Sequence, residues 1–172
     1  YRSYEYLPGP AAPVPAGYEP FYISHYGRHG SRYHSSEKAY DRPLSVLLQA
    51  SEAGKLTPKG QEVLAKVEAL AADAYLRYGD LSPRGTAEHR GIAERMYAAW
   101  PEVFSTDGGR VCRVESRSTL VPRCILSMAA FNERLKELNP EIRMTRESSQ
   151  RYIPYMSNGA GLNSQRKASG AV

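Results

Sequence analysis

The 172-residue sequence has little cysteine and no long apolar segment. Its cysteines, Cys112 and Cys124, are too few for a disulfide-rich scaffold and do not have the spacing of a zinc site. Isolated cysteines of this kind are more often small buried hydrophobic side chains, and we expect that role here. Because no apolar run approaches the length that crosses a membrane, we expect no membrane-spanning segment.

Dense basic runs are also absent, although basic residues are in excess. The sequence has 23 lysines and arginines against 18 acidic residues, which gives a formal net charge of +5. Arginine outnumbers lysine, and this bias favours phosphate or carboxylate ligands. A nucleic-acid partner would require basic and aromatic residues together on one face. We do not expect one, because the positive charges are dispersed and much of the tyrosine lies near the N-terminus.

Some well-known phosphate-handling and metal-binding patterns are missing as well. The sequence has no Gly-x-x-x-x-Gly-Lys-Ser/Thr loop, which argues against an NTPase. Neither cysteine is followed by arginine at the offset found in cysteine phosphatases. His25 and His29 are four residues apart, but they lie in a segment that reads as strand and loop rather than helix. We therefore expect no metal site and no cofactor.

The chain divides by composition into three parts. Residues 1–19 form a proline-rich, extended lead-in, residues 20–156 form a folded α/β part, and residues 157–172 form a flexible tail or the start of a further segment. Because the sequence starts at Tyr1 rather than at methionine, we expect that an N-terminal segment was removed. The length is enough for one domain with a buried core.

The pattern of apolar residues and helix-start signals predicts alternating strands and helices. Thr57-Pro58 and Ser82-Pro83 each place a capping residue before a proline suited to the first helical position. Ser118 or Thr119 is the expected cap of a later helix. The expected elements are a strand at 21–26, a loop at 27–35, helices at 58–78 and 83–99, a strand at 111–115 and a helix at 120–138. This order predicts an α/β fold with a mainly parallel sheet and flanking helices, incomplete in this chain.

The loop at 27–35 carries the motif Arg28-His29-Gly30-Ser31-Arg32. Arginine stays charged and presents a planar fork that matches phosphate oxygens. A neutral histidine can act as a nucleophile near pH 7. Two fixed cations beside such a nucleophile suit attack on a phosphoryl group, whereas the simplest alternative is a basic surface turn.

Arg123 is predicted to join this motif although it is distant in sequence. It lies at the start of the helix expected at 120–138, directly after a strand. In parallel sheets, ligands bind beyond the carboxyl ends of the strands, so the two segments are expected to converge. Taken alone, an arginine at a helix start would more often be a surface cation.

The chain resembles the histidine acid phosphatases over residues 20–155. The motif Arg28-His29-Gly30-Ser31-Arg32 is similar to the family signature. Ser118-Thr119, Arg123-Cys124, Ser127 and Ala130-Phe131 resemble a later family stretch, and Leu81-Ser82-Pro83-Arg84-Gly85 resembles its helix start. The combination is most similar to the multiple inositol polyphosphate phosphatases, especially bacterial ones.

The resemblance implies a mechanism and a set of site residues. His29 would be the nucleophile and would become phosphohistidine, while Arg28, Arg32 and Arg123 would hold the phosphate without a metal. Tyr33, His34 and His89 would contact a substrate such as phytate. For His34 a simple solvent-exposed position is equally open, and for His89 a hydrogen-bonded core position is equally open. These residues, in order of chain position, are Arg28, His29, Arg32, Tyr33, His34, His89 and Arg123.

The sequence departs from the family in one respect. The family carries a later motif, histidine followed by Ala-Glu or Asp, which supplies the general acid, but no histidine follows His89 here. General acid catalysis is typically worth about 10²–10⁴-fold. We therefore expect the N-terminal part of a longer enzyme, completed by a C-terminal segment or a second chain. The alternative is a phosphate-binding fragment or relic without catalysis. Family habit also implies a periplasmic, secreted or outer-surface location.

Overall fold

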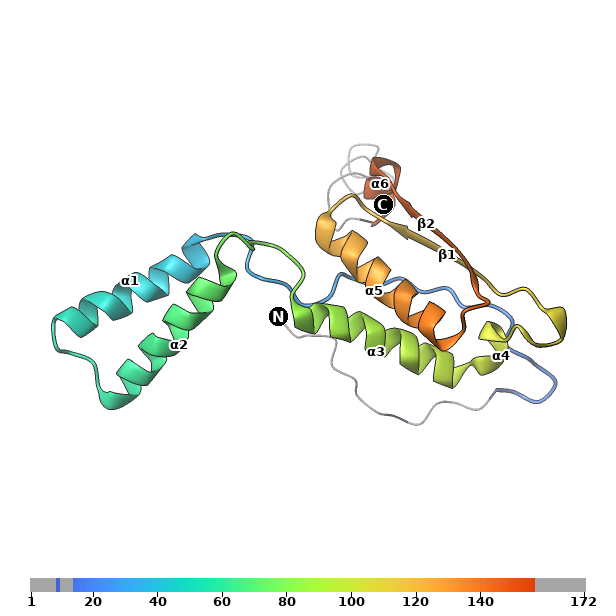
Figure 1. The fold of residues 1–172 in the computed structure, drawn as a ribbon, viewed down its shortest axis with the longest axis horizontal. Helices are drawn as coiled ribbons and strands as arrows, with labels where there is room; N and C mark the ends of the chain where they lie inside the picture. Colours follow the sequence, from blue (N-terminus) through green and yellow to red (C-terminus); the bar gives the residue numbers. More distant parts are fainter. Residues whose placement is uncertain (1–8, 10–13, 157–172) are drawn as a thin grey trace, which may run out of the picture. The chain divides into compact units, whose positions relative to one another are not determined.

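The computed structural model describes residue 9 and residues 14–156, which fall into two compact units (Figure 1). The first unit combines the described residues up to Ser31 with those from Pro83 onward. The second unit is Arg32–Ser82. The predicted tail at 157–172 and most of the proline-rich lead-in lie outside the described residues.

The first unit contains a small parallel sheet with helices beside it. β1 (Arg113–Ser118) pairs in parallel with β2 (Arg143–Ser148), and α5 (Pro122–Leu138) connects them. The remaining elements of this unit are α3 (Pro83–Ala99), α4 (Pro101–Phe104), the short 3-10 turns Asp107–Gly109 and Gln150–Tyr152, and α6 (Ile153–Met156). This strand–helix–strand connection confirms the expected α/β fold with a parallel sheet.

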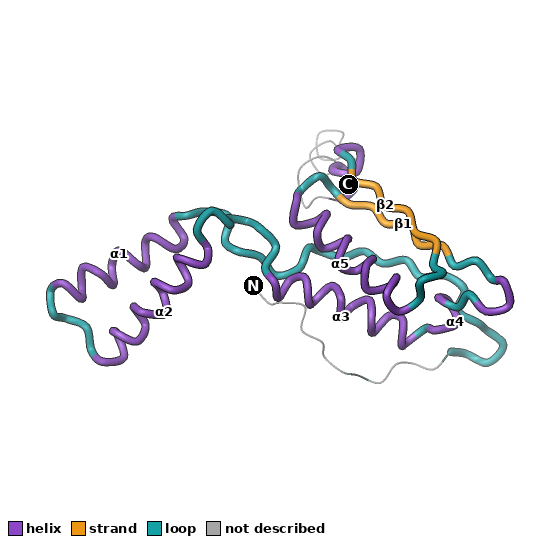
Figure 2. The backbone as a smooth tube through the Cα atoms, viewed as in Figure 1, coloured by secondary structure: helices purple, strands orange, loops and turns teal. Residues whose placement is uncertain are grey.

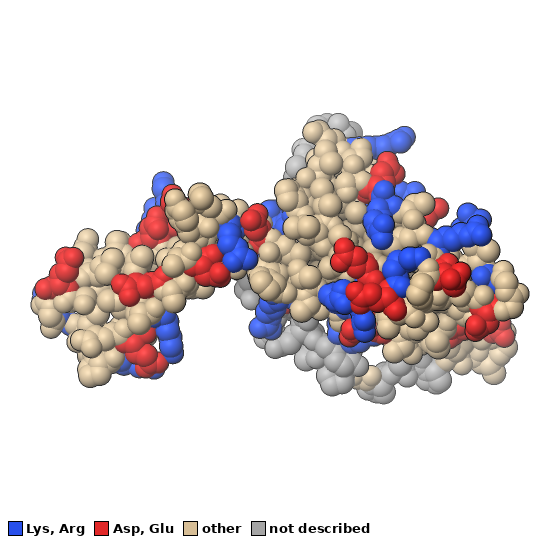
Figure 3. All heavy atoms as spheres, viewed as in Figure 1, with Lys and Arg blue, Asp and Glu red and all other residues tan. Residues whose placement is uncertain are grey.

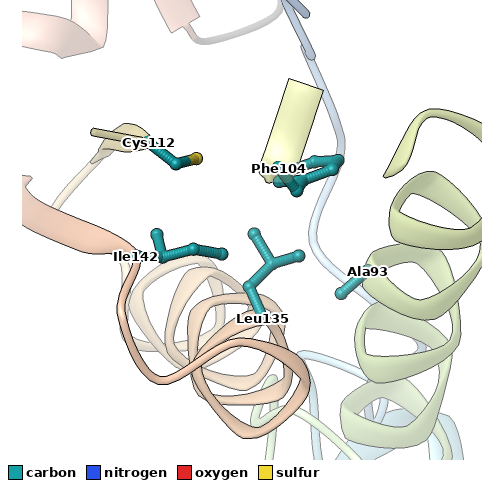
Figure 4. Close-up of a cluster of buried hydrophobic side chains, with 5 residues drawn as sticks. All are labelled: Ala93, Phe104, Cys112, Leu135 and Ile142. Carbon is teal, nitrogen blue, oxygen red and sulfur yellow. The ribbon is translucent and has the colours of Figure 1, made fainter. Parts of the chain in front are cut away.

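A hydrophobic core forms where α3, α4, α5 and the two strands meet (Figure 4). Leu135 of α5 and Ile142, just before β2, are each 1% exposed. Burying a side chain of this size stabilises a fold by about 1.5–3 kcal/mol. The buried members of this core are Ala93, Phe104, Cys112, Leu135 and Ile142. Cys112 therefore has the expected role of a small buried hydrophobic residue, whereas Cys124 is only partly buried.

An ion-pair network also links α3 to α5. Arg134 contacts Glu94 at 2.7 Å and Glu137 at 2.8 Å, and Arg90 contacts Glu137 at 2.6 Å. On the face drawn in Figure 3, basic and acidic side chains are interspersed over this unit. The network bridges two helices whose N-terminal halves carry the residues of the candidate site.

The second unit is a helical hairpin of α1 (Lys38–Glu52) and α2 (Pro58–Ala74). Thr57 caps α2 by accepting the Gly60 N–H at 3.1 Å, and Pro58 occupies the first helical position, as the sequence predicts. Tyr40 is buried, and its ring contacts the rings of His34 and Tyr78.

Several expected boundaries are wrong. Residues 21–26 do not form a strand: they run extended, and within the described residues the only ladder joins β1 to β2, so this segment lacks the partner backbone that a strand requires. The helix expected at 58–78 ends at Ala74, because Leu76 adopts a positive φ of 58° that turns the chain. The strand expected at 111–115 lies at 113–118.

Other elements start elsewhere or were not expected at all. The N-cap of α5 is Val121, without a side-chain hydrogen bond, rather than Ser118 or Thr119. Pro122 at the first helical position sets this start instead, since its missing N–H needs no partner there. The helix at 83–99 is confirmed residue for residue. No element was predicted at α1 or β2.

Candidate active site

Residues 28–31 of the motif lie in an extended segment that packs against α3 and α5 (Figure 2). A Cβ atom at Gly30 would stand 2.4 Å from the carbonyl oxygen and 2.6 Å from the Cα atom of Gly85, in the first turn of α3. Real side chains do not reach such distances from backbone. Gly30 is therefore required because two backbones approach closely, and this approach seats the motif on α3.

Both peptide groups around Gly30 are held by side chains. The Gly30 N–H donates to Ser127 Oγ of α5 at 3.0 Å, and Ser127 is buried. The Ser31 N–H donates to Glu88 Oε2 of α3 at 2.7 Å. Ser31 Oγ also donates to Glu88 Oε1 at 2.7 Å. These bonds fix the backbone of the motif from two helices at once.

The geometry of His29 defines its protonation pattern. His29 Nδ1 lies 2.7 Å from the Gly30 carbonyl oxygen. A carbonyl can only accept, so in this bond Nδ1 carries the proton. A neutral imidazole then has its lone pair on Nε2. That atom can act as a nucleophile or as a proton acceptor.

His89 contacts the motif from α3. Its side chain is buried, and the imidazole is hydrogen-bonded to the backbone of Arg28. Burial lowers the pKa of His89 below its ordinary value, although the bond to the Arg28 backbone acts in the opposite direction. Of the two sequence interpretations of His89, the hydrogen-bonded core histidine describes this position. Its contact with substrate stays a prediction.

Arg123 is the second residue of α5 and is partly buried. It precedes Ser127 by four residues, so the two side chains lie on one face of the helix, one turn apart. Since Ser127 binds the Gly30 N–H, the face that carries Arg123 is the face on which the motif rests. The N-terminus of α5, which is the positive end of the helix dipole, lies one turn from that contact.

Arg32, Tyr33 and His34 belong to the second unit and make contacts there. The Arg32 guanidinium donates to the Tyr33 carbonyl oxygen at 2.7 Å. The Tyr33 hydroxyl donates to Asp73 at 2.8 Å, and the Arg77 guanidinium stacks on its ring at 4.3 Å from the centroid. The His34 N–H donates to the Tyr40 hydroxyl. Their predicted contacts with a substrate remain untested.

Three residues that hold the motif were missed by the sequence analysis as site residues: Gly85, Glu88 and Ser127. Gly85, Glu88 and His89 have helical spacing i, i+3 and i+4, which places them on one stripe of α3. In the sequence, the signal for these residues was a glutamate beside a histidine on the apolar face of the predicted helix. Ser127 gave a similar signal as a small polar residue close to the apolar face of α5.

Glu88 is a buried carboxylate at this site. Burial is the largest influence on its pKa and acts to raise it, but the hydrogen bonds from Ser31 and Arg84 together outweigh burial, and the pKa lies below its ordinary value. Glu88 is therefore ionised at neutral pH.

Among the described residues, no group of three or more histidine, cysteine or acidic side chains has the arrangement of a metal site. No described helix is long and apolar enough to cross a membrane.

The fold of this chain has a counterpart among solved structures. No protein-family model and no curated protein matches the sequence. The α/β fold, with its two parallel strands and flanking helices, matches part of a larger solved structure. It is similar to the crystal structure of the multiple inositol polyphosphate phosphatase of Bifidobacterium longum in complex with inositol hexasulfate, with a TM-score of 0.57 and 24% sequence identity. The match covers 76% of this chain and 26% of that one, so the chain spans about a quarter of that protein's length.

Proposed function

We propose that this protein hydrolyses phosphomonoesters through a phosphohistidine intermediate on His29. The observation that carries the proposal is the 2.7 Å bond between His29 Nδ1 and the Gly30 carbonyl, which puts the imidazole lone pair on Nε2, the atom that would attack phosphorus. Phosphoryl transfer needs a nucleophile and fixed positive charge beside it. In the sequence, His29 lies between Arg28 and Arg32, which are residues of those two kinds.

The reaction has two steps. His29 Nε2 attacks phosphorus, the bond between phosphorus and the ester oxygen breaks, and the leaving alkoxide takes a proton from a general acid. Water then attacks the phosphohistidine, its P–N bond breaks, and inorganic phosphate leaves while His29 returns to its neutral form. None of His29, Arg28, Arg32 and Arg123 is this general acid, which another residue would supply.

Fixed positive charge neutralises the phosphoryl oxygens in this scheme. Arg28 and Arg32 flank His29 in sequence, and Arg123 extends from the N-terminal turn of α5. Guanidinium forks and helix N-termini both bind phosphate oxygens. Substitution of one such cation by alanine should lower kcat by about 10²–10³-fold.

We propose inositol polyphosphates, with phytate as the representative, as the substrate class. A chain with a net charge of +5 attracts a polyanion. The similar structure from Bifidobacterium longum was crystallised with inositol hexasulfate, which is also a polyanion on an inositol ring. The sequence motifs that resemble the multiple inositol polyphosphate phosphatases support the same class.

The direct test measures inorganic phosphate released from phytate by the full-length protein and by its His29→Ala variant. We expect release by the wild type and a loss of at least about 10³-fold in the variant. Release that survives the substitution would exclude His29 as nucleophile.

A second candidate function is phosphate-ligand binding without turnover. It would use the same arginines to hold a phosphate group, without transfer of that group to His29. Calorimetric titration with phytate separates the two functions. Binding without phosphate release identifies a binder, and binding with release identifies the enzyme.

We further propose that a C-terminal segment or a second chain completes the fold, in a periplasmic, secreted or outer-surface protein. Large apolar side chains of the first unit are exposed, among them Phe21 at 84% and Leu126 at 53%, and a covering element would bury them. The location is supported only by the family resemblance.

A further inference from the structure

Glu88 has a role that the proposed chemistry does not assign. Its side chain is only 7% exposed, and both of its carboxylate oxygens are bound to Ser31 at 2.7 Å. Arg84 supplies a further contact at 3.4 Å. A buried carboxylate is costly unless its oxygens are hydrogen-bonded, and these bonds go to the residue two positions after His29.

One peptide group connects Glu88 to His29. The N–H of Ser31 and the C=O of Gly30 belong to the same planar trans peptide, so they point in opposite directions. Glu88 Oε2 accepts the N–H on one side, and His29 Nδ1 donates to the C=O on the other side. The Glu88 carboxylate and the His29 imidazole are therefore hydrogen-bonded to the same peptide group.

We propose that Glu88 is a positioning residue for His29, which acts through the Gly30–Ser31 peptide to fix the imidazole as the Nδ1–H tautomer. The carboxylate anchors the peptide plane, so the Gly30 carbonyl keeps its direction toward Nδ1. A peptide whose N–H donates to an anion is also polarised, and its carbonyl accepts a stronger hydrogen bond. The other tautomer would set the Nδ1 lone pair against the carbonyl oxygen and place the proton on Nε2.

Ser127 completes this support from the opposite helix. It accepts the N–H of the preceding peptide, at Gly30, so the carbonyl that His29 uses lies between two anchored N–H groups. The two bonds differ in charge: Ser127 offers a neutral hydroxyl, whereas Glu88 offers a carboxylate. Only the Glu88 bond is charge-assisted and lies on the peptide that carries the accepting carbonyl.

The test combines NMR with kinetics on the full-length protein. The ¹⁵N shifts of the His29 ring nitrogens report the tautomer whether or not the protein has activity. In Glu88→Ala we expect the Nε2–H form to appear beside the Nδ1–H form and kcat on phytate to fall by about 100-fold, with a smaller change in KM, because the reacting atom is misplaced. Glu94→Ala, on the same helix but ion-paired to Arg134, is the matched control and should change neither.

An unchanged His29 ring spectrum in folded Glu88→Ala overturns the proposal, whatever the activity. If the alanine variant does not fold, Glu88→Gln decides, because it keeps the shape of the acceptor and removes its charge. The Nδ1–H proton of His29 should then shift upfield, and an unchanged shift overturns the proposal. The kinetic part rests on the function proposed above. If the tautomer responds but the wild type releases no phosphate, the positioning role stands and the proposed hydrolysis fails.

Discussion

At the scale of single residues, the motif is defined by what surrounds Gly30. Its N–H donates to Ser127, its carbonyl accepts from His29, and its Cα faces the backbone of Gly85. The chemistry assigned to His29 depends on a neighbour that has no side chain. Substitutions at glycine positions therefore test the packing of the site without touching a charged group.

Gly30→Ala should destabilise the protein by about 1–3 kcal/mol, because the new Cβ would stand 2.4 Å from a backbone oxygen that cannot move without displacing α3. Urea unfolding measures this change. Gly91→Ala is the matched control in the middle of α3, where the Cβ meets only the flexible end of Arg95. There, alanine should stabilise the helix by about 0.5–1 kcal/mol. Equal effects of the two substitutions would contradict the close approach at Gly30.

His89 gives a prediction about pH. Burial lowers its pKa in the folded protein below the ordinary value of 6.5, so the unfolded chain binds the proton more readily than the folded protein does. The stability linked to His89 is fully present above that pH and is lost as the pH falls below it. Between pH 7 and pH 5, the free energy of unfolding should fall less in His89→Gln than in the wild type. Parallel curves from urea titrations at each pH would refute this assignment.

At the scale of elements, α3 and α5 act together. Each contributes to the motif near its N-terminal end, through Gly85 and Glu88 from α3 and Ser127 from α5. Nearer their C-terminal ends, the Arg90–Glu137–Arg134–Glu94 network joins the two helices. The network bridges the two helices on which the motif rests, and its exposed ion pairs contribute little to their packing.

Glu137 is the centre of that network. Hydrogen bonds from Arg90 and then Arg134 lower its pKa from 4.5 to about 2. The stability that it contributes is present above pH 4.5 and is lost as the pH falls through about 2. Glu137→Gln should lower the Tm at pH 7 by about 2 °C or less, since the pair is exposed, and the difference from the wild type should shrink as the pH approaches 2.

The control for this prediction is Glu133→Gln, an exposed position on the same helix that makes none of these hydrogen bonds. Its Tm should differ from that of the wild type by less than the Tm of Glu137→Gln does, because Glu133 acts on Arg90 only through its charge and without a hydrogen bond. A Glu137→Gln variant whose Tm deficit grows on acidification would contradict the sign of the linkage.

The elements could be predicted from the sequence where local signals decide them. The proline and its capping residue place the start of α2, and apolar spacing with Pro83 gives α3 its full extent. The segment at 21–26 looked like a strand because its residues are apolar and aromatic. Strand formation depends on a partner backbone, which local pattern does not reveal. The same limit explains why β2 was missed, since it follows a short turn and is largely exposed.

At the scale of the whole molecule, the candidate site depends on contacts between distant segments. Gly30 and Ser127 are 97 positions apart, and Ser31 and Glu88 are 57 apart. Sequence reasoning predicted Arg123 near the motif through the rule that strand ends converge, but the described residues before the motif form no strand, and the hydrogen bond from Gly30 to Ser127 is what links the motif to α5. It could not find Glu88, because a glutamate on a helix is usually a solvated charge, and only the packing of α3 shows that this one is buried.

The central claim is that His29 accepts a phosphoryl group on Nε2. Rapid acid-free quenching of the full-length protein with ³²P-labelled phytate, followed by peptide mapping at alkaline pH, tests it most directly. The account predicts an acid-labile label on the peptide that contains His29, at the Nε2 position, and no label in His29→Ala. Phosphate release without any labelled histidine, or with the label on another residue, would contradict it.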